Sequence, residues 1–222
     1  VFVDAANITI TGLKFLDNYV SGAANNNKTI EVAGDNFTYK NNVMEVFDGG
    51  ALYISDWRYV ASPEKSTVET YTITGNLFKL GASVNVSSGA GATGAASGRV
   101  ISNNTFSADG LDVNWASVSF NGIVPSVGWY AFPVGGATIT GNTFTGVDLP
   151  IRSRGTVKDN FDWTAYFSGN NFDKAVIAWD TIANKPRAYE YTSGTYLLNN
   201  VMSIGTVIQT EIGHAAAGDT VK

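Results

Sequence analysis

The sequence predicts an all-β protein, a single-stranded parallel β-helix of about seven turns with long loops on one side. Three observations predict it. One six-residue phrase recurs along the chain, short strands with alternating apolar and polar residues follow the copies, and no segment before residue 206 has the period of a helix. One turn of a solenoid cannot bury its inner face alone, whereas stacked turns bury it jointly.

The recurring phrase has an apolar residue, a polar residue, then Gly or Asn, usually Asn, a variable residue and a final Phe or Met. Its copies are ITGLKF (10–15), YKNNVM (39–44), ITGNLF (73–78), ISNNTF (101–106), ITGNTF (139–144), FSGNNF (167–172) and LLNNVM (197–202). We expect the final side chains to stack inside the solenoid at the strand spacing of about 4.8 Å. The Asn is expected at the bend, in left-handed backbone, bonded to the Asn of the next turn.

After the final residue of a copy comes a short gap, and then a second β-rich run is predicted. The predicted runs are 50–57, 81–88, 110–117, 147–154, 174–181 and 204–211. In the third run, alternation turns Leu111, Val113 and Trp115 to the buried face. An antiparallel sandwich also has short strands and Gly-rich turns, but it does not require the same phrase at every turn.

The chain divides into a parallel β-helix over residues 1–205 and a short terminal segment, 206–222, which resembles the start of a further β-helix unit. Joined to the first residues, the end reads AGDTVK–VFVDAANITITG, which is continuous β-helix sequence. Tandem modules, end-to-end stacking of identical chains and a simple domain truncation all remain open. An open end of a β-helix exposes strand edges and normally needs a cap.

Composition excludes several functions. The net charge is −5, the isoelectric point is near 4.8, and only 15% of residues are charged, which argues against a nucleic-acid partner. The chain has no Cys, so disulfides and thiolate metal sites are excluded. The chain contains no run of about 18 apolar residues, so no membrane-spanning helix is predicted.

The seven phrases and their strands resemble the right-handed parallel β-helix superfamily, the pectin-lyase-like proteins, over essentially the whole chain. That superfamily includes pectate lyases, polygalacturonases, tailspikes and many bacterial surface proteins, and this chain resembles the surface-layer and adhesin-type modules among them. The resemblance implies a right-handed helix, a secreted or cell-surface location, and polysaccharide chemistry on an outward strand face. Because one scaffold hosts many activities, it does not fix the function.

Three residues are candidates for catalysis: Asp112, Arg152 and Asp180 occupy predicted outward positions on adjacent turns, roughly 5 to 10 Å apart. Two acids flanking an arginine can bind a uronic acid or act as general acid and base. The alternative is a surface charge row that keeps the turns soluble and in register. The polygalacturonase motifs are absent, and the single histidine, His214, stands in Gly-His-Ala. The pectate-lyase pattern is matched by residue type alone, so calcium stays open and no metal site is assigned.

Loops 56–70, 116–137 and 180–194 carry many aromatic residues, and aromatic rings beside a polar strand face can stack on sugars. The candidate carbohydrate-binding residues are Trp57, Tyr59, Asn114, Trp129, Tyr130, Arg154, Tyr189 and Tyr191. The alternative is that these rings fold back to cover the side of the helix.

These observations favour a non-enzymatic structural or adhesive module of a secreted or cell-surface bacterial protein, with a polysaccharide or cell-surface glycan as its partner. The alternative is a polysaccharide lyase or glycoside hydrolase that acts on an acidic polysaccharide. No cofactor is expected.

Overall fold

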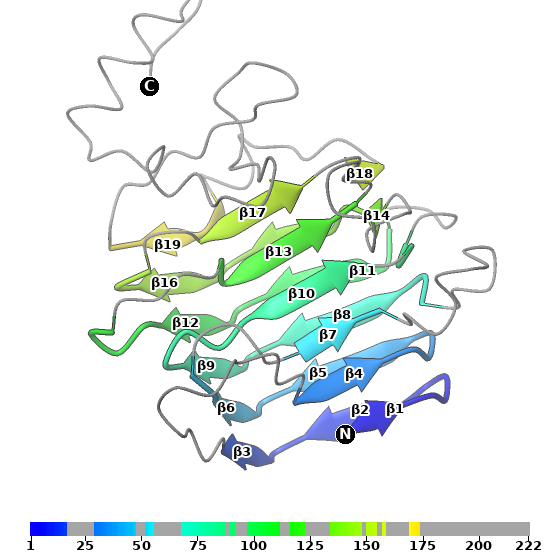
Figure 1. Cartoon of the computed structure of the whole chain (residues 1–222), viewed down its shortest axis with the longest axis horizontal. Coiled ribbons are helices and arrows are strands. Elements are labelled where there is room, and N and C mark those ends of the chain that lie inside the picture. Colours follow the sequence, from blue (N-terminus) through cyan, green and yellow to red (C-terminus); the bar gives the residue numbers. More distant parts are fainter. Residues whose placement is uncertain are drawn as a thin grey trace, which may run out of the picture.

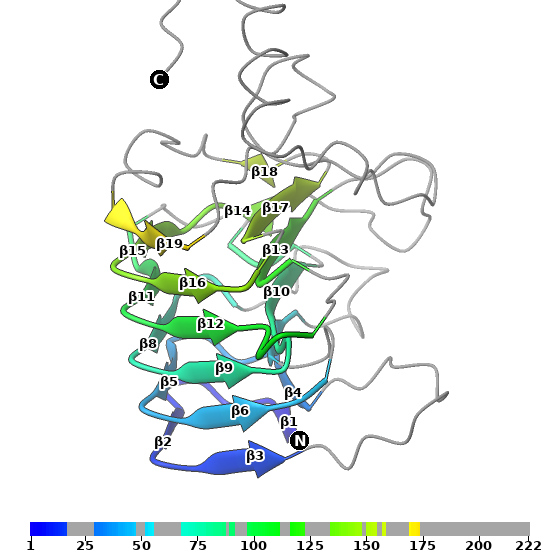
Figure 2. The same cartoon turned by 90° about the vertical axis from the view of Figure 1, so that its left-hand side faces the viewer.

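The computed structural model shows an all-β parallel β-helix. It describes residues 1–16, 29–47, 52–55, 68–87, 89–91, 97–111, 116–122, 134–147, 150–154, 157–158 and 169–173. For residues 152–154 and 157–158 it describes the backbone. Every strand pair in these ranges is parallel, and the strands stack into three long sheets that run up the molecule (Figures 1 and 2).

Each turn of the solenoid passes once through the three sheets, A, B and C, in that order. Sheet A contains β1 (Phe2–Val3), β4 (Ile30–Val32), β7 (Leu52–Ile54), β10 (Val84–Ser87), β13 (Val118–Asn121) and β17 (Ile151–Arg154). Sheet B contains β2 (Thr9–Thr11), β5 (Phe37–Lys40), β8 (Tyr71–Thr74), β11 (Arg99–Ser102) and β15 (Thr138–Thr140). Sheet C contains β3 (Lys14–Leu16), β6 (Val43–Glu45), β9 (Leu77–Lys79), β12 (Thr105–Ser107), β16 (Thr143–Thr145) and β19 (Asn171–Phe172). A short fourth stack pairs β14 (Val134–Gly135) with β18 (Val157–Lys158).

The predicted fold class is confirmed, but the described residues form fewer turns than the seven predicted. The described residues place six strands in each of sheets A and C and five in sheet B. The seventh phrase, 197–202, and the terminal segment, 206–222, lie outside the described residues.

The core is filled from all three sheets by apolar side chains that alternate with outward ones. Phe78, Phe106, Phe144 and Phe172 of sheet C stack face to face, with ring centroids 4.7, 5.1 and 5.2 Å apart. The final residue of the phrase therefore forms the internal stack that the sequence predicts.

The phrase forms the tight corner between sheets B and C. Asn42, Asn76, Asn104, Asn142 and Asn170 are buried there, and each amide is bonded to the Asn of the neighbouring turn. The ladder is as predicted, but the left-handed residue is not the ladder Asn. Positive φ belongs to the residue before it, which is Asn41, Gly75, Asn103 or Gly141, and Gly12 takes the same conformation before Leu13. The amide can then point inward along the stack while the preceding residue makes the bend.

One predicted strand is in the wrong place. The run 110–117 was expected to enter sheet A with Leu111 buried, but Leu111 is 37% exposed. The strand that pairs with β10 and β17 is β13, seven residues further on, and it buries Val118 and Phe120. Pairing with both neighbours, and not alternation alone, decides which run joins the sheet.

Two of the predicted aromatic loops start at the same corner of the solenoid. Residues 55–70 connect β7 to β8, and residues 122–137, which include β14, connect β13 to β15, so both leave sheet A toward sheet B. The prediction of a loop over 116–137 is wrong at its start, because residues 118–121 form β13. The middle parts of both loops, and all of loop 180–194, lie outside the described residues.

Candidate functional site

The outward side of sheet A is the strand face on which the sequence places function. Along the inward rows, Val84 and Val86 of β10 pair with Val118 and Phe120 of β13. Asn85 and Ser87 of β10 therefore alternate to the other side, beside Ser119 and Asn121 of β13. These four residues are called the polar face of sheet A below.

The polar face is buried, although its residues point away from the core. Asn85 is 2% exposed, Ser87 5%, Ser119 1% and Asn121 0%. Strand alternation predicts that Asn85 and Ser87 point outward, and the register agrees, but alternation does not predict their burial. Hydroxyl and amide groups at this depth need hydrogen-bond partners.

Two atoms of the polar face have no such partner in the described part of the chain. They are the Ser119 hydroxyl oxygen and the Asn121 carbonyl oxygen Oδ1. The Asn121 amide donates from Nδ2 to Oδ1 of Asn85, which orients both amides across the two strands. A buried oxygen without a partner costs free energy in the folded chain, so each of these oxygens calls for a partner such as an ordered water or a bound group.

The arginine positions continue the polar face onto the next turn. In register, Arg152 of β17 lies opposite Ser119, and Arg154 lies opposite Asn121. Strands in one sheet are about 4.8 Å apart, so both arginine positions adjoin the face. Of the predicted site residues, these two are the ones whose backbone is described.

The other predicted site residues lie outside the described residues. They are the catalytic candidates Asp112 and Asp180 and the carbohydrate-binding candidates Trp57, Tyr59, Asn114, Trp129, Tyr130, Tyr189 and Tyr191. The structure therefore does not test whether Asp112, Arg152 and Asp180 converge. Sequence reasoning missed Ser119 and Asn121, because the stronger alternation of LDVNW drew the predicted strand away from VSFN.

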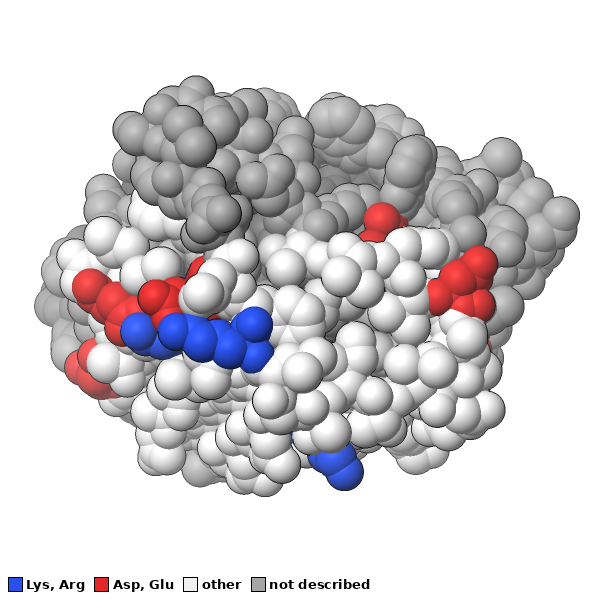
Figure 3. Space-filling model, turned by 90° about the horizontal axis from the view of Figure 1, so that it is seen from below, with Lys and Arg blue, Asp and Glu red and all other residues white. Residues whose placement is uncertain are grey.

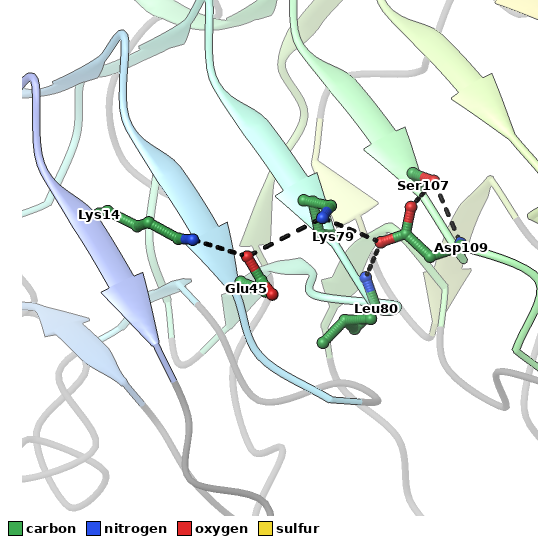
Figure 4. A network of polar contacts seen from close by, with 6 residues as sticks. All are labelled: Lys14, Glu45, Lys79, Leu80, Ser107 and Asp109. Carbon is green, nitrogen blue, oxygen red and sulfur yellow. Dashed lines mark hydrogen bonds and ion pairs between the residues drawn. The ribbon is translucent and has the colours of Figure 1, made fainter.

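A surface charge row does exist, but on the outward side of sheet C. Lys14 Nζ lies 3.1 Å from Glu45 Oε2, and Lys79 Nζ lies 3.9 Å from both Glu45 Oε2 and Asp109 Oδ2 (Figure 4). Signs alternate from turn to turn, so the row favours the observed register. Exposed pairs of this kind contribute less than about 1 kcal/mol each. This row is a structural feature of sheet C and gives no sign of a ligand.

Comparisons with known proteins identify no relative: no family model, no curated protein and no solved structure matches this chain. In the described ranges, no group of three or more His, Asp or Glu side chains is placed to hold a metal ion. Among the same residues, no helix has the length and apolar character needed to cross a membrane.

Proposed function

We propose that this chain is a non-enzymatic structural or adhesive module of a secreted or cell-surface bacterial protein, and that it binds a glycan on the polar face of sheet A. We further propose that it belongs with the pectin-lyase-like β-helices, among modules of the surface-layer and adhesin type. The parallel β-helix supports this class, since a rigid stack of turns presents a fixed outward face.

The observation that carries the proposal is the pair of buried, unpartnered oxygens at Ser119 and Asn121. Sugar hydroxyls donate and accept hydrogen bonds, so they match a face made of hydroxyl and amide groups. The adjoining Arg152 and Arg154 positions suit a carboxylate-bearing sugar, because guanidinium groups bind carboxylates through paired hydrogen bonds.

The test is the substitution Ser119→Ala. Because Ser119 Oγ has no partner in the described part of the chain, we expect the free energy of unfolding to stay equal or to rise. Glycan affinity is expected to fall at least about tenfold, which corresponds to about 1.4 kcal/mol. Binding is measured by calorimetry on polygalacturonate, alginate and laminarin, two acidic polymers and a neutral one.

The matched control is Ser102→Ala. Ser102 is also largely buried and outward, but it lies on sheet B and donates to Thr74 Oγ1, 3.1 Å away. We expect this variant to keep wild-type affinity. If wild type binds none of the three polymers, or if both variants bind equally well, the glycan proposal is wrong.

The enzymatic alternative rests on Arg152 in register beside the face. The same polymers test it: a lyase releases unsaturated uronates from polygalacturonate or alginate, and a hydrolase releases reducing ends. Either product from wild type, lost in Arg152→Lys, would replace the non-enzymatic proposal.

A further inference from the structure

Arg99 is a charged side chain inside the apolar core. It starts β11, and its side chain has no exposed surface. In register it follows Tyr71 of β8, which in turn follows Phe37 of β5, so two other turns fill the same inward row with aromatic rings. An apolar side chain would therefore suit the row, whereas a buried guanidinium carries a large desolvation cost. Packing alone therefore does not explain an arginine at this position.

The guanidinium of Arg99 binds the backbone of two different turns. Its Nε donates to the carbonyl oxygen of Gly136 at 2.6 Å, and its Nη1 donates to the carbonyl oxygen of Gly91 at 2.8 Å. Gly91 belongs to the connection between β10 and β11, and Gly136 to the connection between β13 and β15. Hydrogen bonds from a charged donor are the strong ones, so one side chain fixes both connections.

Glycines shape the place where the guanidinium lies. A Cβ added at Gly91 would come within 2.6 Å of Arg99 Cδ, and one added at Gly135 would come within 2.6 Å of Arg99 Cζ. The backbone there is also stacked, since Gly91 N donates to Val68 O and Gly135 N donates to Ala90 O, both at 2.8 Å. At Gly91 and Gly135 there is thus no room for a side chain beside Arg99.

Both connections adjoin the polar face of sheet A. The first begins directly after Ser87, and the second begins directly after Asn121. The second also contains Trp129 and Tyr130, two of the predicted carbohydrate-binding residues. Arg99 itself lies on another strand and faces the core, so it acts on the face through the backbone it holds.

We propose that Arg99 is a positioning residue for the glycan site: through Gly91 and Gly136 it fixes the two connections that border the polar face. The inference rests on the proposed glycan binding. It adds a residue outside the face, and it predicts that replacing Arg99 weakens binding more than a core substitution on the same strand does.

The test compares Arg99→Met and Arg99→Lys with wild type. Methionine fills the row without charge, and lysine keeps the charge but lacks the planar fork that reaches two carbonyls. We expect both variants to lower the free energy of unfolding, because methionine leaves the carbonyls of Gly91 and Gly136 without their donor and lysine keeps a buried charge with fewer hydrogen bonds. Hydrogen exchange is expected to become faster in segments 88–98 and 122–137 and to stay unchanged in sheet C.

Affinity for whichever of polygalacturonate, alginate and laminarin binds wild type is expected to fall at least about tenfold in both variants, about 1.4 kcal/mol. The control is Ile101→Val, which trims the core from the same strand without touching either connection; it is expected to keep affinity within about twofold.

The outcomes separate the two proposals. Wild type without affinity for any of the polymers overturns the proposed function. Wild-type binding that persists in Arg99→Met, or exchange in segments 88–98 and 122–137 that equals the Ile101→Val pattern, overturns the positioning role.

Discussion

Asn104 joins three turns of the solenoid with one side chain. Its Nδ2 donates to Ile73 O at 3.0 Å and to Asn142 Oδ1 at 2.9 Å. Its Oδ1 accepts from both the backbone N and Nδ2 of Asn76, at 3.0 and 2.9 Å. The side chain is 1% exposed, so these bonds replace water entirely. Because an amide supplies both donors and an acceptor, this one side chain can bond to the turn before it and to the turn after it.

Asn104→Ala is therefore expected to destabilise the chain by at least about 3 kcal/mol, because it leaves buried donors of Asn76 and the carbonyl of Ile73 unsatisfied. The control is the neighbouring Asn103→Gly. Asn103 is exposed and has a φ of 54°, a conformation that glycine adopts freely, so the change should be below about 1 kcal/mol. Urea unfolding of the two variants checks the contrast, and equal losses would contradict the ladder's energetic role.

Asp35 ties the stability of the fold to pH. Burial raises the pKa of its carboxyl, but hydrogen bonds, led by that from the backbone N–H of Thr70, outweigh burial and hold the pKa below its ordinary value. Oδ1 accepts from Glu69 N at 2.9 Å, Thr70 N at 2.7 Å and Thr70 Oγ1 at 3.0 Å. A folded-state pKa below the unfolded one stabilises the fold above the unfolded pKa, and this stabilisation disappears as pH falls through the folded pKa.

The prediction for Asp35→Asn follows from that sign. The variant keeps an acceptor but no charge, so wild type should be more stable than the variant above about pH 5, and the difference should shrink as the pH falls below about 4. Urea unfolding between about pH 2 and pH 7 measures it. A difference that does not change with pH would show that Asp35 acts through shape and not through its charge.

At the scale of elements, repetition explains what the sequence predicts and what it does not. The corner between sheets B and C has the same environment on every turn, so one phrase specifies it, including the inward Phe106 and Phe144 that stack with an interplanar angle of 7°. The left-handed residue was placed one position too late, because Asn at either position fits a bend. The phrase itself does not show which residue has the positive φ of the bend and which residue hydrogen-bonds to the next turn.

Sheet A is less predictable because its connections vary in length. β10 begins six residues after Phe78, whereas β13 begins twelve residues after Phe106, so the alternating run 111–115 stood where a strand was expected. Ser119 and Asn121 were missed for this reason. Their burial, and that of Asn85, is a tertiary property of the face that strand alternation does not encode.

At the scale of the whole molecule, each turn touches only the turns above and below it, so stability is close to a sum of turn and neighbour terms. Among the described strands, those of the first turn, β1 to β3, pair with a neighbouring turn on one side only. Seen from below, the described residues are mostly neither basic nor acidic, and their charged side chains lie in a few separate places (Figure 3). Leu13 and Leu16 of this turn are 52% and 61% exposed. Leu13 also ends the asparagine ladder: its backbone N donates to Asn42 Oδ1, but its side chain offers no acceptor to a further turn.

This arrangement predicts that the same substitution acts differently at the end and in the middle. Phe106 is 0% exposed and stacks on both sides, so Phe106→Ala should cost about 3–5 kcal/mol and lower protection from hydrogen exchange on several turns. Phe15 is half-buried and belongs to the first turn, so Phe15→Ala should cost less than about half of that and raise exchange within residues 1–16. Equal losses, with exchange raised over the whole chain in both variants, would mean that the solenoid unfolds as one unit and that its ends are held as firmly as its middle.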